Sequence, residues 1–104
     1  MGMFDELRCH VALPDEEGEA LRSAGHTYQT KDLDCQLDLH EITAEGRLVR
    51  LEWNYAEKLW HSPVDLNYHG MLNFYTLTMD KRWFEYDAKF TDGKVTEIQG
   101  GKRP

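Results

Sequence analysis

A two-residue alternation of apolar and polar side chains limits the folds open to this sequence more than any other feature. In residues 83–90, the apolar side chains of Phe84, Tyr86, Ala88 and Phe90 occupy every second position. Successive side chains point to opposite faces of a β-strand, so this spacing places all four on one buried face. An α-helix would need apolar residues three and four positions apart. The segment is therefore predicted to be a β-strand with one solvent-facing side.

The same alternation occurs elsewhere, and turn residues separate the resulting strands. Residues 35–55 are expected to form a β-hairpin whose turn ends at Gly46, a residue that tolerates a left-handed backbone. Residues 71–79 are apolar on both faces, which is typical of a central strand. Asp92-Gly93 is a second hairpin signal, and residues 95–98 are expected to form a short final strand.

Other segments give weaker signals. Residues 3–11 are expected to form an edge strand, and residues 26–31 are expected to be extended. Residues 15–19 indicate a solvated loop, followed by a short helical turn over 19–24. Residues 56–68 contain Pro63 and no clear period, so they are predicted to be a long connection, a feature that is often functional.

The predicted fold class is mainly β, with five to seven short antiparallel strands and at most one short helix. Every strong link is a tight turn, whereas parallel strands need a long crossover, so a parallel α/β fold is disfavoured. The strands would form a curled sheet, a small barrel or a sandwich. A chain of 104 residues has room for one core, so we expect a single domain over residues 1–100 and a flexible tail at 101–104.

The charge balance is acidic and uneven. Twelve Lys and Arg residues against 19 Asp and Glu residues give a net charge of −7, which argues against direct binding to nucleic acid or to an anionic membrane. Residues 1–52 carry all of this net charge. No stretch of 18 apolar residues and no secretory signal are recognised, so we expect a cytoplasmic protein without a membrane span.

The residue types that suit metal binding or catalysis lack the required spacing. Cys9, His10, His26, Cys35 and His40 could ligate zinc, but the sequence has no Cys-x-x-Cys, His-x-x-x-His or His-Glu-x-x-His motif. It also has no Gly-x-Ser-x-Gly elbow and no glycine-rich phosphate loop. We therefore expect no metal, no cofactor and no enzymatic activity, with both cysteines present as reduced thiols.

Aromatic residues are the best candidates for a binding site. Trp83 falls on the solvent-facing side of its predicted strand, and Trp60 lies beside His61 in the long connection. Tryptophan is a common anchor of protein interfaces, although core packing explains most aromatic residues. Trp60, His61 and Trp83 are therefore predicted to contact a partner.

Several segments resemble a family of small bacteriophage and prophage proteins with no established activity. The most specific one is Tyr-Gln-Thr-Lys-Asp-Leu-Asp-Cys at residues 28–35. Further similar segments are Met3–Cys9, Leu13–Asp15, Ile42–Leu48, Gly70–Tyr75, Trp83–Tyr86 and Phe90–Lys94. The resemblance implies a phage context and a bacterial cytoplasm, and it carries over no catalytic residue.

Three functions follow from these features. The leading one is a small accessory protein that binds a host protein with a basic surface, such as a nucleic-acid-binding protein, and inhibits a bacterial defence system in the manner of an anti-CRISPR. The first alternative is a small-ligand or enzymatic pocket lined by Trp53, Tyr55, Tyr75 and His69, with Lys31 as its polar group. The second is a structural homodimer that pairs through edge strands.

Overall fold

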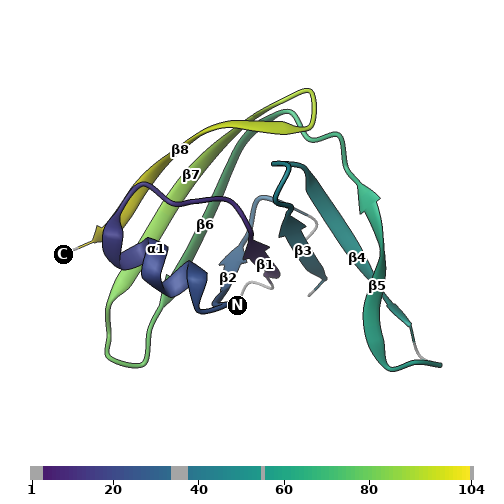
Figure 1. Cartoon of the computed structure of the whole chain (residues 1–104), viewed down its shortest axis with the longest axis horizontal. Helices are drawn as coiled ribbons and strands as arrows, with labels where there is room; N and C mark the ends of the chain where they lie inside the picture. The colour runs from purple at the N-terminus through teal and green to yellow at the C-terminus, as the bar shows by residue number, and fades with distance from the viewer. Residues whose placement is uncertain (1–3, 34–37, 55, 104) are drawn as a thin grey trace.

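The computed structural model describes residues 4–33, 38–54 and 56–103, and within them eight β-strands form one sheet beside one α-helix (Figure 1). In chain order, the elements are β1 Asp5–Cys9, α1 Glu16–Ser23, β2 Thr27–Thr30, β3 Leu39–Ile42, β4 Leu48–Asn54, β5 Leu59–Asp65, β6 Gly70–Leu77, β7 Trp83–Thr91 and β8 Lys94–Arg103. The prediction of a mainly β, single-domain fold with a curled sheet and one short helix is confirmed. The sheet does not close into a barrel.

The strand order is β5-β4-β3-β1-β2-β6-β7-β8. All neighbouring strands are antiparallel except β1 and β3, which run parallel. The purely antiparallel meander was therefore wrong in this detail, and the sheet has one strand more than the predicted maximum. A long crossover is required only between consecutive parallel strands, whereas here the antiparallel β2 brings the chain back before β3 begins. No helical crossover is needed for such a pair.

Three strands differ from expectation. β1 lies inside the sheet between β2 and β3, so residues 3–11 do not form an edge strand. Residues 59–65 form β5 in place of part of the expected long connection. Pro63 fits there because β5 is an edge strand, and the register shifts opposite it, between Arg50 and Glu52 of β4. The expected tail from residue 101 instead continues β8 as far as Arg103.

Both predicted hairpins form. β3 and β4 pair antiparallel across a turn in which Gly46 has a φ of +86°, as the left-handed position requires. Thr43 and Arg47 close this turn through a 2.8 Å bond from the Thr43 N–H to the Arg47 carbonyl. Residues 35–37 and Tyr55, at the two ends of the predicted hairpin, lie outside the described residues. β7 and β8 pair around Gly93, which has a φ of +84°.

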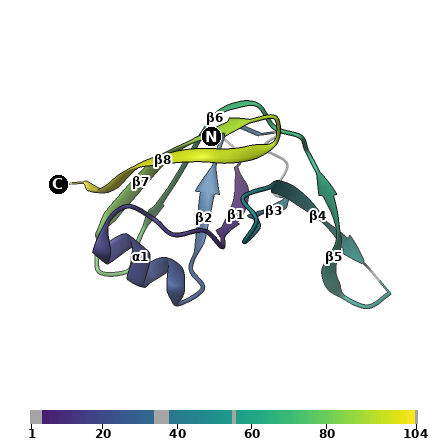
Figure 2. The ribbon, with the colours of Figure 1, turned by 45° about the horizontal axis from the view of Figure 1, so that its top comes forward.

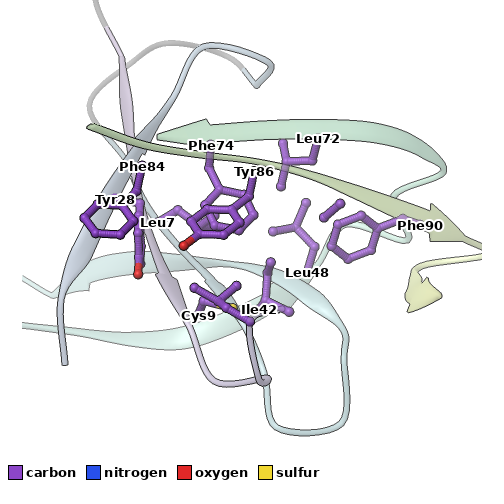
Figure 3. Packing of buried hydrophobic residues seen from close by; sticks show 12 residues of the cluster. Leu7, Cys9, Tyr28, Ile42, Leu48, Leu72, Phe74, Phe84, Tyr86 and Phe90 are labelled. Atoms are coloured by element: carbon purple, nitrogen blue, oxygen red, sulfur yellow. The ribbon is translucent and has the colours of Figure 1, made fainter. Parts of the chain in front are cut away.

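The main core fills the inner face of the curled sheet (Figure 3). The alternation predicted for residues 84–90 is confirmed, because Phe84, Tyr86, Ala88 and Phe90 are all buried there. Phe74 stacks on Tyr86, with 5.3 Å between the ring centroids. The remaining fully or nearly fully buried members are Leu7, Cys9, Leu13, Tyr28, Ile42, Leu48 and Leu72.

The helix α1 lies across the inner side of the sheet, next to β8 (Figure 2). Its N-cap, Asp15, accepts one hydrogen bond from the Gly18 N–H at 2.9 Å and another from the Tyr86 hydroxyl at 2.7 Å. Gly18 is buried against that hydroxyl, where a larger residue would overlap it. The solvated loop expected at 15–19 is therefore wrong from residue 16 onwards, because capping and packing against Tyr86 extend the helix to Glu16.

Candidate functional site

The outer face of β6 and β7 carries the residues that alternate with the core positions. The two strands pair so that Leu77 lies opposite Trp83, Tyr75 opposite Glu85 and Asn73 opposite Asp87. Two side-by-side rows of side chains therefore face away from the core. We call this surface the outer patch, and its members are Met71, Asn73, Tyr75, Leu77, Trp83, Glu85, Asp87 and Lys89.

A stacked aromatic pair occupies one part of the outer patch. The rings of Tyr75 and Trp83 lie 20° from parallel, with 5.3 Å between their centroids. The Trp83 indole N–H donates a hydrogen bond of 3.1 Å to Oε1 of Glu85. Both aromatic side chains are partly exposed. The indole is thus held in one orientation by a ring on one strand and a carboxylate on its own strand, which lowers the entropy lost on binding.

Asn73 organises the acidic part of the outer patch. Its side-chain amide donates to Oε2 of Glu85 and Oδ1 of Asp87, each at 3.0 Å. Its backbone N–H donates to Oδ2 of Asp32 at 2.7 Å. The hydrogen bonds from Trp83 and Asn73 lower the pKa of Glu85. One asparagine therefore positions three carboxylates beside the aromatic pair, and the Glu85 carboxylate is held in its charged form.

Exposed apolar side chains flank these groups. Met71 is 54% exposed near one end of β6, and Leu77 is 60% exposed at the other end. Met79, in the turn that follows β6, is fully exposed. An apolar and aromatic centre with polar groups beside it is the usual anatomy of a protein–protein interface. The outer patch can therefore bind a surface that offers apolar contacts together with positive charge.

The structure separates the residues predicted to form the binding site. Trp83 lies in the outer patch, whereas Trp60 and His61 lie in β5, at the opposite end of the sheet. Their backbones pair with Trp53 and Glu52, and their side chains lie outside the described part of the structure. Lys31 is exposed immediately after β2, next to Asp32. The aromatic residues Trp60 and Trp83 thus do not share one site.

The residues of the alternative pocket are also dispersed. Tyr75 faces outward beside Trp83, whereas His69 precedes β6 and its Nδ1 accepts a hydrogen bond from the Asp92 N–H at 3.3 Å. The side chains of Trp53 and Tyr55 fall outside the described residues. Tyr75, His69 and Lys31 do not line the hollow between residues 11–14 and 95–98, nor the hollow between the start of α1 and residues 100–102.

The candidate metal ligands and nucleophiles are not gathered into a reactive centre in the part of the chain that the structure describes. No group of three or more His, Cys, Asp or Glu side chains there is placed to hold a metal ion. Cys9 is buried, and burial raises the pKa of its thiol, which disfavours the reactive thiolate. The His26 ring bonds to the Thr76 hydroxyl at 2.8 Å, and His40 is buried in β3. Cys35 lies outside the described residues.

Sequence reasoning missed the two residues that organise the outer patch. Tyr75 was assigned to the alternative pocket, and Asn73 was assigned to no site. A polar amide in the middle of an otherwise apolar strand was the available signal for Asn73. The stacking of Tyr75 on Trp83 has no local signal, because it depends on the register of two strands.

Comparisons of the chain with known protein families, with curated proteins and with solved structures found no match. In the described residues, no helix is both long enough and apolar enough to cross a membrane.

Proposed function

We propose that this chain is a non-enzymatic binding protein that attaches to a partner protein through the outer patch. The observation that carries the proposal is the Tyr75–Trp83 stack, which is fixed beside carboxylates that Asn73 positions. A preorganised aromatic pair supplies contact area at low entropic cost, and the carboxylates select a partner with a basic surface. Binding through this face leaves the inner core and α1 undisturbed.

The biological setting of the proposal comes from the sequence. The net charge of −7 and the resemblance to small phage proteins favour an accessory protein that acts in the bacterial cytoplasm. A host protein that binds nucleic acid offers the required basic surface. Occupying that surface would block access of the nucleic acid, and this is a direct way to inhibit a defence system such as CRISPR.

The proposal is tested by capture from a bacterial lysate, followed by affinity measurement on the purified partner. Trp83→Ser removes the stack, and Asp87→Lys reverses one charge of the outer patch. We expect each to weaken binding at least tenfold, or by about 1.4 kcal/mol or more. Glu52→Lys is the matched control, because it makes the same charge change on the exposed side of β4, at the other end of the sheet.

The salt dependence gives a second readout. Affinity should fall as salt rises from low to high concentration, because exposed charge pairs are screened. Equal losses for Asp87→Lys and Glu52→Lys would show that only net charge matters. Unchanged binding of the Trp83→Ser variant would reject the outer patch as the contact surface.

A further inference from the structure

The sheet has two edge strands, β5 and β8. We call the space along the free edge of β8 the seam. β8 is the last strand of the sheet, and its ladder partner is β7. The sheet curls so that the far edge of β8 faces the chain that leads from β1 into α1 (Figures 1 and 2). Contacts close the seam at both ends. At one end, the Val95 N–H donates a 2.8 Å hydrogen bond to the carbonyl of Gly46 in the β3–β4 turn. At the other end, Gly101 lies against Asp15, beside the ion pair of Lys102 with Glu17.

Between these two points, the edge of β8 is available for pairing. Residues 96–100 have no backbone hydrogen bond to any segment other than β7 in the part of the chain that the structure describes. An unpaired edge of this kind is a template for an added strand. Five residues of extended chain span roughly 17 Å, so this stretch of β8 is long enough to pair with a short extended segment.

A groove runs along this open edge. It has a volume of about 270 Å³ and lies between residues 11–14 and residues 95–98. Its apolar lining comes from Val11, Leu13, Val95 and Ile98, which also pack against the main core. An apolar side chain from an added strand would therefore extend the existing core.

The seam is acidic. A second hollow, of about 470 Å³, lies at the Gly101–Asp15 contact, between the start of α1 and residues 100–102. Three carboxylates and one ammonium group line the second hollow: Asp15, Glu16, Glu17 and Lys102. Along the groove, Glu97, which pairs opposite Lys89, is the one carboxylate among residues 95–98. The Glu17 carboxylate is paired with two cations, the Lys102 ammonium at 3.3 Å and the Arg82 guanidinium at 3.4 Å, whereas Asp15, Glu16 and Glu97 form no ion pair with a base among the described residues. Negative charge therefore predominates along the seam.

We propose that the seam binds an extended segment of a partner protein in which apolar residues alternate with lysine or arginine. The segment adds to β8 as a further strand through main-chain hydrogen bonds. Glu97 and Ile98 are adjacent, so they lie on opposite faces of β8. The apolar residues of the segment enter the groove beside Ile98, and its basic residues lie beside Glu97. A second copy of this chain fits poorly, because it would bring the same excess of carboxylates.

The test uses a fluorescein-labelled peptide, Lys-Val-Lys-Val-Lys-Val-Lys, with fluorescence anisotropy as the readout. We expect saturable binding to the full chain. Two control peptides, one with glutamate in place of lysine and one N-methylated at every peptide bond, should bind at least tenfold more weakly. N-methylation removes the main-chain donors and keeps the charge, so it separates strand addition from simple attraction.

Two matched variants locate the site. Glu97→Lys should weaken binding of the basic peptide at least tenfold, whereas Glu52→Lys, with the same charge change on β4, should alter it less than twofold. Far-ultraviolet circular dichroism establishes that both variants are folded, and amide shifts in residues 96–100 report the contact directly. Trp83→Ser changes no charge and lies opposite Arg103, outside residues 96–100, so it should not affect peptide binding, and failure here is distinguishable from failure of the outer patch.

Several results would overturn the proposal. They are absence of saturable binding, equal binding of the N-methylated peptide, and equal effects of Glu97→Lys and Glu52→Lys. A dimer seen by sedimentation that dissociates in Glu97→Lys would also overturn it, because a second copy would then occupy the seam.

Discussion

The two ends of the sheet are both built from antiparallel hairpins, but they bury very different amounts of apolar surface. At the β6–β8 end, the inner side chains of Phe74, Phe84 and Tyr86 are fully buried beneath α1. The ladder between β6 and β7 runs without interruption from Gly70 to Leu77. Buried side chains and backbone pairing thus both stabilise β6 and β7 over the full length of their ladder.

At the β4–β5 end, the apolar contacts are few. Leu39, Val49 and Leu51 form a separate small cluster of buried residues. In β5, Leu59 and Val64 are exposed, and the ladder with β4 is broken by the register shift near Arg50. This end of the sheet therefore depends on local pairing, whereas the other end is part of the common core. We expect the β4–β5 end to open at a lower free energy than the rest of the protein.

The largest expected effects come from truncating one residue in each cluster. Phe74→Ala should lower the free energy of unfolding by about 3–5 kcal/mol, which is a large part of the total for a domain of this size. Leu51→Ala should cost less, about 2 kcal/mol, because fewer buried neighbours surround it. Urea unfolding measures both values.

Hydrogen exchange adds the spatial information. In the Leu51→Ala variant, the amides of β4 should lose protection from exchange. The amides of β6 and β7 should still exchange only through global unfolding. In Phe74→Ala, protection should fall throughout the sheet. Uniform loss of protection in both variants would show that the two ends unfold as one unit.

The helix α1, which covers the β6–β8 end, contains a buried glycine, Gly18. Replacing glycine by alanine inside a helix normally stabilises it by up to about 1 kcal/mol. Here the added methyl group would overlap the Tyr86 hydroxyl and the Asp15 carboxylate. We expect Gly18→Ala to destabilise the protein by about 1–3 kcal/mol, as measured by urea unfolding.

A double mutant identifies the cause. Tyr86→Phe removes the hydroxyl, so Gly18→Ala should cost less in that background than in the wild type. Ser23→Ala, at the exposed end of the same helix, is the control and should change stability by less than about 0.5 kcal/mol. Simple additivity of Gly18→Ala and Tyr86→Phe would contradict the proposed overlap.

The difference between the two ends also explains how much of the fold the sequence predicted. Alternation identified the buried face of β7, where the period is regular and the ladder with β6 is continuous. For β6, the expectation of two covered faces was wrong, because only the inner face is buried and Met71 and Leu77 are exposed on the other. β5 was missed because Pro63 and its neighbours have no period, and the edge position together with the register shift accommodates the proline. The start of α1 was missed because Gly18 packs against Tyr86, a contact across 68 positions that no local pattern contains.

The candidate site was predictable only in part, for the same reason. The position of Trp83 on the outer face follows from alternation alone. Its stacking on Tyr75 and the bonds from Asn73 require the pairing of β6 with β7, in which Leu77 lies opposite Trp83. Trp60 was grouped with Trp83 by residue type, but the strand order places them at opposite ends of the sheet.

The smallest expected effect is the dependence of stability on acid pH. It tests the contribution of β3, whose Leu39 belongs to the small cluster at the β4–β5 end. His40 is 2% exposed there, and its Nδ1 has no hydrogen-bond partner among the described residues. Burial lowers the pKa of His40, and Arg50 acts in the same direction, while Asp5 and Asp38 oppose the shift. The unfolded chain therefore takes up a proton first, near pH 6.5, and stability falls as the pH drops below that value.

Replacing His40 by a residue that stays neutral should remove part of this dependence. We expect the free energy of unfolding of the wild type to fall between pH 7 and pH 5, by no more than about 1.4 kcal/mol per pH unit for this one group. In His40→Gln, urea unfolding at pH 5, 6 and 7 should show a shallower slope. His26→Gln should remove less of it, because burial lowers the pKa of His26 but its ring is more exposed. If His40→Gln retains the full slope, another buried group causes the loss of stability at low pH. In that case β3 does not contribute to the difference in stability between the two ends of the sheet.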